Sequence, residues 1–342
     1  MSLITPVSAQ PGTAGRPLSP SAPAVSVVVP FNAWNDWVME CLQGLRRQTV
    51  PDFDVWLAPD ALPPEPYRAR LDAMGWGPRL HVEPTGPGNP SRKRNAALAR
   101  SASPVAALVD SDAWPREDWL EKAVALLDDE TAVVTGPNLT PPGDEWPRRV
   151  AGRVMESPLG FGGGYIRHVP APRQVVREMP TCNMVLRRLE GLLFREDLDT
   201  GEDMMYCSDV RARGKRVLYD PEVVVFHHRR RLFRPFMRQF YAYGFHKGRL
   251  ARAGSDITYL WQAFPALLVL YLAGWAVSLL LPLPPALRWL AAAPGLLYAV
   301  AILAESLRRG RCAAERMAAP AAFAAAHAAY GTGYLAGLLS RR

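Results

Sequence analysis

The stretch Val105-Ala106-Ala107-Leu108-Val109-Asp110-Ser111-Asp112 decides the fold expected for this chain. Its apolar part is typical of a buried parallel strand, and open α/β sheets bind their ligands just beyond the carboxyl ends of such strands. The carboxylates of Asp110 and Asp112 can hold a divalent cation, and Mg2+ or Mn2+ is usually bound by carboxylates together with substrate phosphates. The stretch therefore suggests a nucleotide diphosphate site. In an alternative interpretation, Asp112 only caps a helix that begins near Pro115.

The segments before this stretch alternate between strand and helix patterns. Runs of β-branched residues predict strands, and apolar residues that recur every three or four positions predict helices. Strands that alternate with helices imply a parallel sheet with right-handed crossovers. The predicted order is strand 25–29, helix 34–47, strand 53–57, helix 67–74, strand 79–82, helix 91–99 and strand 105–109.

The chain has 342 residues and a net charge of +8, and it has room for a sizeable domain plus a smaller part. Residues 1–23 are rich in Pro, Ser, Ala and Gly and lack a continuous apolar core, which predicts a disordered leader and no signal peptide. Cys41, Cys182, Cys207 and Cys312 show no metal-binding or disulfide spacing, so we expect reduced thiols without ligands.

The last quarter of the chain contains three apolar stretches that predict about three transmembrane helices. Residues 259–281 carry no charge and, at ~1.5 Å per helical residue, can cross a hydrocarbon core of ~30 Å. Residues 289–304 form a shorter apolar stretch, and residues 317–340 are uncharged but rich in Ala and Gly. In the third stretch, Gly333 and Gly337 form a small-xxx-small pattern that permits close helix packing. A buried helix hairpin of a soluble domain is the alternative there.

Basic residues around these stretches predict their orientation. Arg308, Arg309, Arg311 and Arg316 lie between the second and third stretches, whereas only Arg288 lies between the first and second. Loops rich in Lys and Arg stay in the cytoplasm, so the more basic loop is expected there. With three spans, the large amino-terminal domain is also cytoplasmic. This pattern predicts a multi-pass protein of the inner cell membrane.

A basic segment, residues 229–254, precedes the first predicted span, and residues 229–252 include eight Lys or Arg residues and no acidic residue. Its apolar residues recur at helical spacing, so one face of the predicted helix is apolar and the other cationic. Such a helix is expected to lie in the membrane interface, attracted by anionic lipids. Alternatively, the charge only enforces orientation. The position beside a predicted span argues against nucleic acid as a partner. The apolar face of this predicted helix consists of Phe233, Phe236, Met237 and Phe240.

Several short motifs, taken in order, resemble those of glycosyltransferase family 2 and extend to its membrane-bound exopolysaccharide or succinoglycan-type branch. The resemblance implies a GT-A fold, in which a mostly parallel sheet with helices on both faces binds a nucleotide-sugar and transfers the sugar with inversion. It implies a GT-A domain over residues 24–228, the basic segment 229–254 and a transmembrane region 255–342. The motifs are residues 25–30, Gln48-Thr49, Asp60, Lys93-Arg94-Asn95, Asp110-Ser111-Asp112, residues 157–164, Gly201-Glu202-Asp203, Tyr219-Asp220-Pro221 and residues 238–244.

The resemblance also implies roles for single residues in binding a UDP- or GDP-sugar. Pro30 and Asp60 would border the base and ribose, and Arg94 would lie near the diphosphate. Asp110 and Asp112 would hold the divalent metal, Mn2+ or Mg2+. The family often has two acidic residues at Asp60 and the position before it, which is a proline here. Asp60 can also be an ordinary turn residue, and Arg94 can belong to a solvated basic face.

The chemistry of sugar transfer requires two further groups. Negative charge grows on the departing nucleoside diphosphate, where a divalent ion and cationic side chains stabilise it. The attacking acceptor hydroxyl must lose its proton to a carboxylate within hydrogen-bond reach. Glu202 and Asp203 are the candidates, and the family's order favours Asp203 as the base. Alternatively, they are first-turn acids that suit the dipole of a helix running to Arg213.

Three further features have open interpretations. His227 and His228 end a β-rich run, and either imidazole can complete the metal shell or contact the diphosphate. We predict His227 as the third metal ligand, with a solvated or helix-capping pair as the alternative. Residues 157–167 contain four glycines and are either a mobile lid or acceptor loop, or a plain connection. Asn183 is a possible acceptor contact by resemblance only.

These features together predict an inverting, metal-dependent glycosyltransferase that moves a single sugar to a lipid-linked saccharide at the cytoplasmic membrane face, in surface polysaccharide or glycolipid synthesis. The sequence lacks the QxxRW signature of processive synthases in this family, so one sugar per encounter is expected. The alternatives are a polyprenyl-phosphate monosaccharide synthase and a membrane-anchored scaffold that binds a sugar nucleotide without catalysis. A nucleotidyltransferase, which would release pyrophosphate, is a further possibility.

Overall fold

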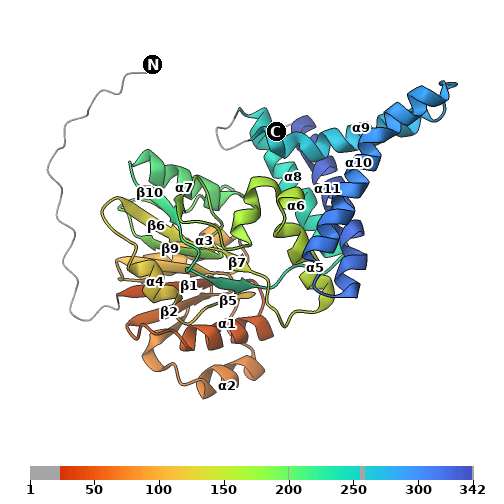
Figure 1. Cartoon of the computed structure of the whole chain (residues 1–342). Coiled ribbons are helices and arrows are strands. Elements are labelled where there is room, and N and C mark those ends of the chain that lie inside the picture. Colours follow the sequence, from red (N-terminus) through yellow and green to blue (C-terminus); the bar gives the residue numbers. More distant parts are fainter. Residues whose placement is uncertain (1–23, 199, 255–258, 341–342) are drawn as a thin grey trace.

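A computed structural model describes residues 24–198, 200–254 and 259–340 of the chain. Figure 1 shows a layered α/β part and, beside it, a layer of longer helices formed by the last third of the sequence. The predicted disordered leader, residues 1–23, lies outside the described residues.

The main sheet has eight strands and is mixed. Its strands are β1 (Val25–Pro30), β2 (Phe53–Ala58), β3 (Leu80–Val82), β4 (Val105–Val109), β6 (Thr131–Thr135), β8 (Gln174–Val175), β9 (Asn183–Arg187) and β10 (Arg216–Tyr219). Their order is β3-β2-β1-β4-β9-β6-β10-β8. The four strands predicted from the sequence form the parallel block β3-β2-β1-β4. The expectation of a parallel sheet needs correction beyond this block, because β9 pairs antiparallel with both β4 and β6.

A second sheet of three strands lies at the carboxyl end of β4. It consists of β5 (Ala113–Pro115), β11 (Val225–His227) and β7 (Asn138–Leu139), in that order. The antiparallel register of β5 and β11 pairs Ala113 with His227, and the N–H of His228 donates to the carbonyl of Asp112 at 3.0 Å, so the side chain of His227 lies near that of Asp112. The helix predicted near Pro115 is absent, because this stretch is strand β5 and the next helix begins at Trp119. The interpretation of Asp112 as a helix cap is therefore wrong.

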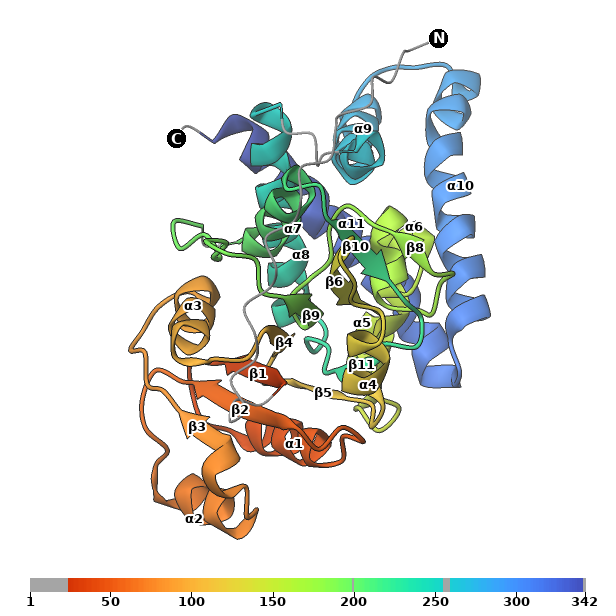
Figure 2. The same cartoon turned by 90° about the vertical axis from the view of Figure 1, so that its left-hand side faces the viewer.

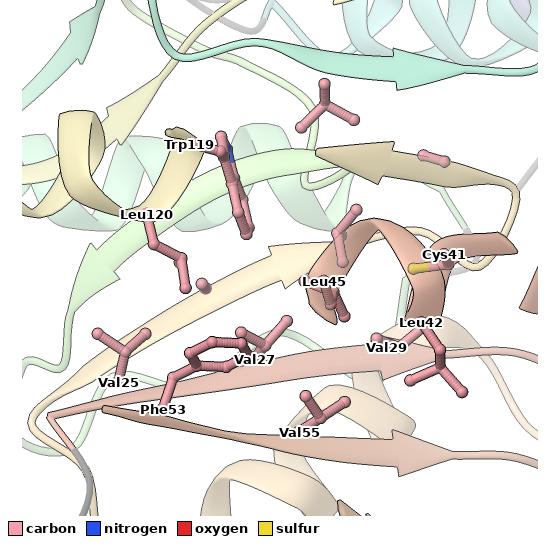
Figure 3. Packing of buried hydrophobic residues seen from close by; sticks show 14 of the residues in the cluster. Val25, Val27, Val29, Cys41, Leu42, Leu45, Phe53, Val55, Trp119 and Leu120 are labelled. Carbon is pink, nitrogen blue, oxygen red and sulfur yellow. The ribbon is translucent and has the colours of Figure 1, made fainter. Parts of the chain in front are cut away.

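The helices of the α/β part bury their apolar faces against the main sheet. In Figure 3, Leu42 and Leu45 of α1 pack over Val27 of β1 and Val55 of β2, and all four side chains are buried. The helix begins after Asn35, whose side chain accepts hydrogen bonds from two backbone N–H groups of its first turn. The helices are α1 (Asp36–Arg46), α2 (Glu65–Ala73), α3 (Pro90–Arg100), α4 (Trp119–Val124), α5 (Trp146–Met155), α6 (Pro158–Phe161) and α7 (Glu202–Ala212), with short 3-10 segments η1 (Gly77–Arg79) and η2 (Gly162–Arg167).

The helical layer consists of α8 (Arg234–Arg252), η3 (Leu260–Ala263), α9 (Phe264–Ser278), α10 (Pro285–Arg309) and α11 (Ala313–Leu339). Figure 2 shows α10 as the outermost helix of this layer. Among the described residues, two helical segments are long and apolar enough to cross a membrane, Leu260–Ser278 and Pro285–Arg309. The third predicted span corresponds to α11, which does not meet this description. The expectation of about three spans is therefore corrected to two candidates.

Helix α11 packs closely on α8 through its glycines. A Cβ atom added at Gly333 would lie 2.2 Å from the carbonyl oxygen of Tyr241, and one at Gly337 would lie 2.1 Å from that of Phe245. Only glycine permits this approach of two helix backbones. The small-xxx-small pattern read from the sequence therefore marks a helix contact within the molecule.

The apolar face predicted for the basic segment is partly buried. Phe236 and Phe240 of α8 are almost fully buried in a cluster with Val154 of α5 and Phe323 of α11. Phe233 and Met237, by contrast, are partly exposed. Half of the predicted membrane-facing surface thus packs against the protein itself, and contact of α8 with a membrane interface stays a prediction.

A buried ion-pair cluster fixes the start of α11 to the α/β part. The carboxylate of Glu315, which is 1% exposed, accepts from Arg149 Nε at 2.7 Å and from Arg153 Nε at 3.2 Å. Both arginines belong to α5. The basic turn between α10 and α11 therefore lies against the α/β part, on the side that the charge pattern predicts to be cytoplasmic.

Candidate active site

A cluster of three potential metal ligands lies where β4 and β11 end. Ligand atoms of Asp110, Asp112 and His227 all lie within 4.8 Å of one another. The Nε2 atom of His227 is 3.1 Å from Asp112 Oδ1 and 4.0 Å from Asp110 Oδ2. Carboxylates suit Mg2+ and Mn2+, and imidazole is a ligand of transition metals, so the mixed set fits Mn2+. The predicted ligands are thus brought together, and their role stays a prediction.

The two carboxylates of this cluster have opposite electrostatic surroundings. Burial raises the pKa of Asp110, and the charge of Arg94 opposes this rise. Burial alone would also raise the pKa of Asp112, but the hydrogen bond and charge of His227, together with Arg230, lower it overall. Arg230 Nη1 lies 3.3 Å from Asp112 Oδ2. Asp112 is therefore the carboxylate that these neighbours hold ionised.

Arg94 connects this cluster to Glu202, which precedes the predicted base Asp203. Its guanidinium is 3% exposed and donates from Nη1 to Glu202 Oε1 at 2.9 Å, while Nη2 lies 3.5 Å from Asp110 Oδ1. The guanidinium also lies over the ring of Phe194, 5.6 Å from its centroid. Arg94 is therefore not part of a solvated basic face. It is a buried cation between two carboxylates of the site.

Asp203 lies in the first turn of α7, as the sequence predicted. Burial raises the pKa of its carboxyl to about 7, and the charge of Glu202 adds to the rise, whereas that of Arg167 opposes it. Gly201 precedes the helix with φ 86°, and a Cβ atom there would lie 2.3 Å from His246 Nε2 of α8. A glycine is needed at this position both for its φ and for the close approach of α8.

Two cations near Asp203 share one acid. Glu178 Oε1 accepts from Arg167 Nη2 at 2.9 Å and from Lys247 Nζ at 3.3 Å. The side chain of Glu178 is 7% exposed. The two cations on this side of the site thus share a buried carboxylate, which lowers the net positive charge next to Asp203.

Asp60 is linked to the predicted nucleotide site by Lys93, whose ammonium bonds its carboxylate and which lines the cavity. The ammonium of Lys93, which is 1% exposed, donates to the carboxylate of Asp60, to Thr85 Oγ1 at 3.2 Å and to the carbonyl of Gly86 at 3.1 Å. Asp60 therefore has a buried charge partner and is more than a plain turn residue. Lys93 belongs to the motif Lys93-Arg94-Asn95, and the sequence alone does not show that Asp60 is its partner.

One cavity of about 1710 Å3 joins these groups. It is lined by Pro30 and by all the other predicted site residues except Asp60. The glycine-rich stretch also lines it, folded as α6 and η2 instead of an open loop. A Cβ atom at Gly162 would lie 2.2 Å from the indole ring of Trp261, so this stretch packs beneath η3. The lining site residues are Pro30, Arg94, Asp110, Asp112, Glu202, Asp203 and His227.

Two candidate residues, His228 and Asn183, form hydrogen bonds with other protein groups. His228 donates or accepts with Asp144 Oδ1 at 2.5 Å and Glu40 Oε2 at 2.8 Å, and these partners raise its pKa against the opposing effect of burial. Asn183 is fully buried, accepts from Trp119 Nε1 at 2.8 Å and donates to the carbonyl of Val223 at 2.7 Å. Asn183 ties β9 to its neighbours, so the interpretation as an acceptor contact needs correction.

Arg229 belongs to the basic segment in the sequence, but its side chain lines the site. It is 2% exposed, donates from Nη1 to Asn138 Oδ1 at 2.9 Å and lies 3.3 Å from His227 Nδ1. His168 Nδ1 also lies 2.7 Å from Asn138 Oδ1. Arg229 follows the end of β11 by two residues, and this spacing from His227 was the available signal.

The carboxylates of Asp110 and Asp112 at the carboxyl edge of a mixed sheet, with a cavity beyond them, agree with the GT-A fold that the sequence motifs resemble. In agreement, residues 26–191 match the family model described as "Glycosyl transferase family 2". This part of the chain is therefore similar to a glycosyl transferase family 2 domain, in agreement with a glycosyltransferase fold. The resemblance to the exopolysaccharide or succinoglycan branch is not established by this match.

Curated relatives and a solved structure agree with this class. The chain is 28% identical over 175 residues to "Pre-mycofactocin glycosyltransferase" of Mycobacterium tuberculosis, in strains CDC 1551 / Oshkosh and ATCC 25618 / H37Rv. This similarity covers 49% of the chain but only 36% of each relative. The structure "Mannosyltransferase PcManGT from Pyrobaculum calidifontis in complex with GDP-Man and Mn2+" has a TM-score of 0.51 at 17% identity, over 94% of this chain and 88% of that one. At this identity the likeness shows the fold alone.

Proposed function

We propose that this protein is an inverting, metal-dependent glycosyltransferase that moves one sugar from a UDP- or GDP-sugar to a hydroxyl of a lipid-linked saccharide at the cytoplasmic membrane face. The observation that carries the proposal is one cavity whose lining includes all three kinds of group. They are the Asp110, Asp112 and His227 cluster, Asp203, and apolar side chains of α9 and α10.

The donor end of the cavity suits a sugar diphosphate. A bound Mn2+ or Mg2+ would offset the negative charge on the departing nucleoside diphosphate. Asp110, Asp112 and His227 would hold that ion, and Arg230, which lies 3.3 Å from Asp112, adds positive charge on the same side. Pro30 and Lys93 line the part of the cavity where the base and ribose would lie.

Asp203 has the properties of the general base for a hydroxyl acceptor. A base works best when its pKa lies near the working pH, and burial with the charge of Glu202 raises the pKa of Asp203 to about 7. Glu202 itself is engaged by Arg94 at 2.9 Å, so it is held towards the metal cluster. This division supports Asp203 as the base and Glu202 as the residue that positions Arg94.

The charges near Asp203 favour a hydroxyl acceptor over a lipid phosphate. A phosphate would be bound by a surplus of cations, as Arg and Lys provide in phosphate sites. Here Arg167 and Lys247 already share Glu178. We therefore place the polyprenyl-phosphate synthase second.

Membrane association is supported by the two candidate spans and by the basic turn at the end of α10. Glu305 accepts from Arg308 Nη2 at 2.8 Å and is bonded to Ser157 at the start of α6. The turn thus lies on the side of the catalytic domain, as expected if both face the cytoplasm. The α9–α10 hairpin would then enter the bilayer from that side.

The test is nucleoside diphosphate release by the full-length protein in membranes. UDP- and GDP-sugars would be supplied with Mn2+ and a polyprenyl-lipid extract, and pre-mycofactocin would be a separate acceptor because of the similarity to its transferases. Release that depends on donor and lipid, and that is lost in Asp112→Ala and Asp203→Asn but kept in Asp197→Asn, is the expected result. Asp197 is an exposed acid paired with Arg195, which makes it a matched control.

Other outcomes select the alternatives. Release that survives Asp203→Asn and needs only polyprenyl phosphate would favour the synthase, whose acceptor oxygen is already anionic. Nucleotide binding without any release would favour the non-catalytic scaffold. Pyrophosphate as the product would indicate a nucleotidyltransferase.

A further inference from the structure

The far end of the catalytic cavity runs between the candidate spans α9 and α10. Its volume of about 1710 Å3 exceeds the ~300–1,000 Å3 usual for one small-molecule site, so it has room for more than a sugar nucleotide. The residues that line this end are mostly apolar. They are Phe264, Pro265, Leu267, Leu268, Tyr271, Pro294, Leu297, Tyr298 and Ala301, and we call them the helix groove.

The helix groove is open to the outside of the helical layer. Leu267 is 58% exposed and Leu297 is 72% exposed, yet both line the cavity. Side chains that face both the cavity and the exterior mark the place where the cavity opens sideways. If α9 and α10 lie in a bilayer, this opening faces hydrocarbon and not water.

The polar groups of the groove bond within the protein. Tyr271 OH donates to the carbonyl of Ala291 at 2.8 Å and accepts from the N–H of Gly295 at 2.9 Å. The hydroxyl is thus inserted into the backbone hydrogen bonds of α10, next to Pro294 in its interior. Tyr298 OH likewise bonds to His327 Nδ1 at 2.8 Å. A guest in this groove would meet methyl, methylene and ring surfaces.

We propose that the helix groove holds the hydrocarbon chain of the lipid-linked acceptor, which enters sideways from the bilayer between α9 and α10. This inference rests on the proposed function and names the part of the acceptor that the protein recognises. The chain would lie in the groove while the saccharide reaches past Trp261 and the glycine-rich stretch to Asp203, because all of these line one cavity. An ordinary membrane anchor would need no opening from the catalytic cavity to its outer surface.

The test is photolabelling of the full-length protein in phosphatidylglycerol nanodiscs, without donor or metal. The probe is geranylgeranyl phosphate with a diazirine on its chain, and mass spectrometry locates the labelled residues. We expect labels at Leu268, Tyr271 and Ala301 that excess untagged geranylgeranyl phosphate removes. Ala301→Trp and Leu268→Trp should each reduce this labelling roughly tenfold, since the indole occupies the groove. Leu270→Trp, an exposed position of α9 outside the cavity lining, should leave it unchanged.

Three results would overturn the inference. They are labels spread evenly over outward residues such as Leu270, labelling unchanged in both groove variants, and equal labelling of the groove by a diazirine-tagged phosphatidylglycerol. Because labelling needs no turnover, it separates this inference from the proposed function. Groove labelling without nucleoside diphosphate release would support the groove and refute the transferase, and release without groove labelling would do the reverse.

Discussion

Arg94 donates from Nη1 to Glu202 Oε1 at 2.9 Å, and this contact joins two motifs that lie 108 residues apart in the sequence. One motif lies within α3, and the other starts α7 and carries Asp203. Because Arg94 Nη2 also lies 3.5 Å from Asp110, the same guanidinium links Glu202, the neighbour of the predicted base Asp203, to the predicted metal cluster. The relative positions of Asp110 and Glu202 thus depend on one buried cation, Arg94.

Replacing Arg94 should destabilise the protein and lower its activity together. Arg94→Gln leaves Glu202 and Asp110 without their shared cation, and breaking a buried ion pair costs about 3–5 kcal/mol. Arg94→Lys should restore little, because one ammonium cannot match the planar fork of the guanidinium. Urea unfolding and nucleoside diphosphate release would measure both effects. Arg100→Gln, an exposed position at the end of the same helix, is the control and should change neither.

The activity should rise with pH through about 7. Asp203 accepts a proton only when ionised, and burial with the charge of Glu202 raises the pKa of its carboxyl to about 7. The value of kcat/KM should therefore be roughly tenfold lower at one pH unit below this pKa than on the plateau above it. Asp203→Asn should abolish this rise of kcat/KM with pH, which is the acid limb of the pH profile, and lower the rate by roughly 10²–10⁴-fold.

A matched variant checks the sign of this effect. The charge of Arg167 opposes the rise in the pKa of Asp203, so Arg167→Gln should move the limb to higher pH. A limb that persists unchanged in Asp203→Asn would show that another group titrates. Initial rates across pH 5.5–9, at donor concentrations well below KM, provide the measurement.

Metal binding should depend on His227 and not on histidines elsewhere. His227 Nε2 lies 3.1 Å from Asp112 Oδ1, so an ion between them would have both as ligands. We expect His227→Ala to raise the Kd for Mn2+ by roughly 10–100-fold and Asp112→Ala to raise it at least as much. Electron paramagnetic resonance of free Mn2+ measures this directly.

His81→Gln is the control for that experiment. His81 is partly exposed and stacks on Trp56, away from the cluster, so its loss should leave Mn2+ binding unchanged. EDTA should abolish donor turnover in the wild type, and added Mn2+ should restore it. Equal Mn2+ affinity in His227→Ala and the wild type would exclude His227 as a ligand.

A methyl group at Gly337 should separate α8 from α11. An added Cβ atom would lie 2.1 Å from the carbonyl oxygen of Phe245, so Gly337→Ala must move two helix backbones apart. Such overpacking costs about 1–3 kcal/mol. Thermal unfolding in detergent should show a lower midpoint. His246 directly follows Phe245 and contacts Gly201, so a shift of α8 should also displace the start of α7.

Gly274→Ala gives the comparison for this prediction. Gly274 lies in α9, and a Cβ atom there has no neighbour within 4 Å. Its substitution should leave the midpoint unchanged or raise it slightly, since alanine favours a helix. If both variants unfold alike, the close contact of α8 and α11 does not contribute to stability.

Much of the α/β part follows from local sequence. The apolar runs at β1, β2 and β4 and the helical periodicity of α1 are local signals, and all four elements lie where the sequence predicts them. By contrast, β9 was not predicted, since pairing between β4 and β6 is decided by partners far along the chain. The prediction of a third membrane span was wrong for a related reason. Alanine and glycine in α11 serve a close contact with α8, which hydropathy alone cannot distinguish from packing in a membrane.

The sequence by itself determined the kinds of chemical groups and their order along the chain. Asp110 and Asp112 behind an apolar strand, and Glu202-Asp203 at a helix start, are local patterns with a chemical meaning. Tertiary structure alone decided which groups meet. The pairing of β5 with β11 lets the side chain of His227, and not that of His228, reach the carboxylate of Asp112, and folding turns Arg229 from a presumed surface charge into a buried one. Proximity depends on contacts between residues far apart in sequence, so local patterns could not reveal it.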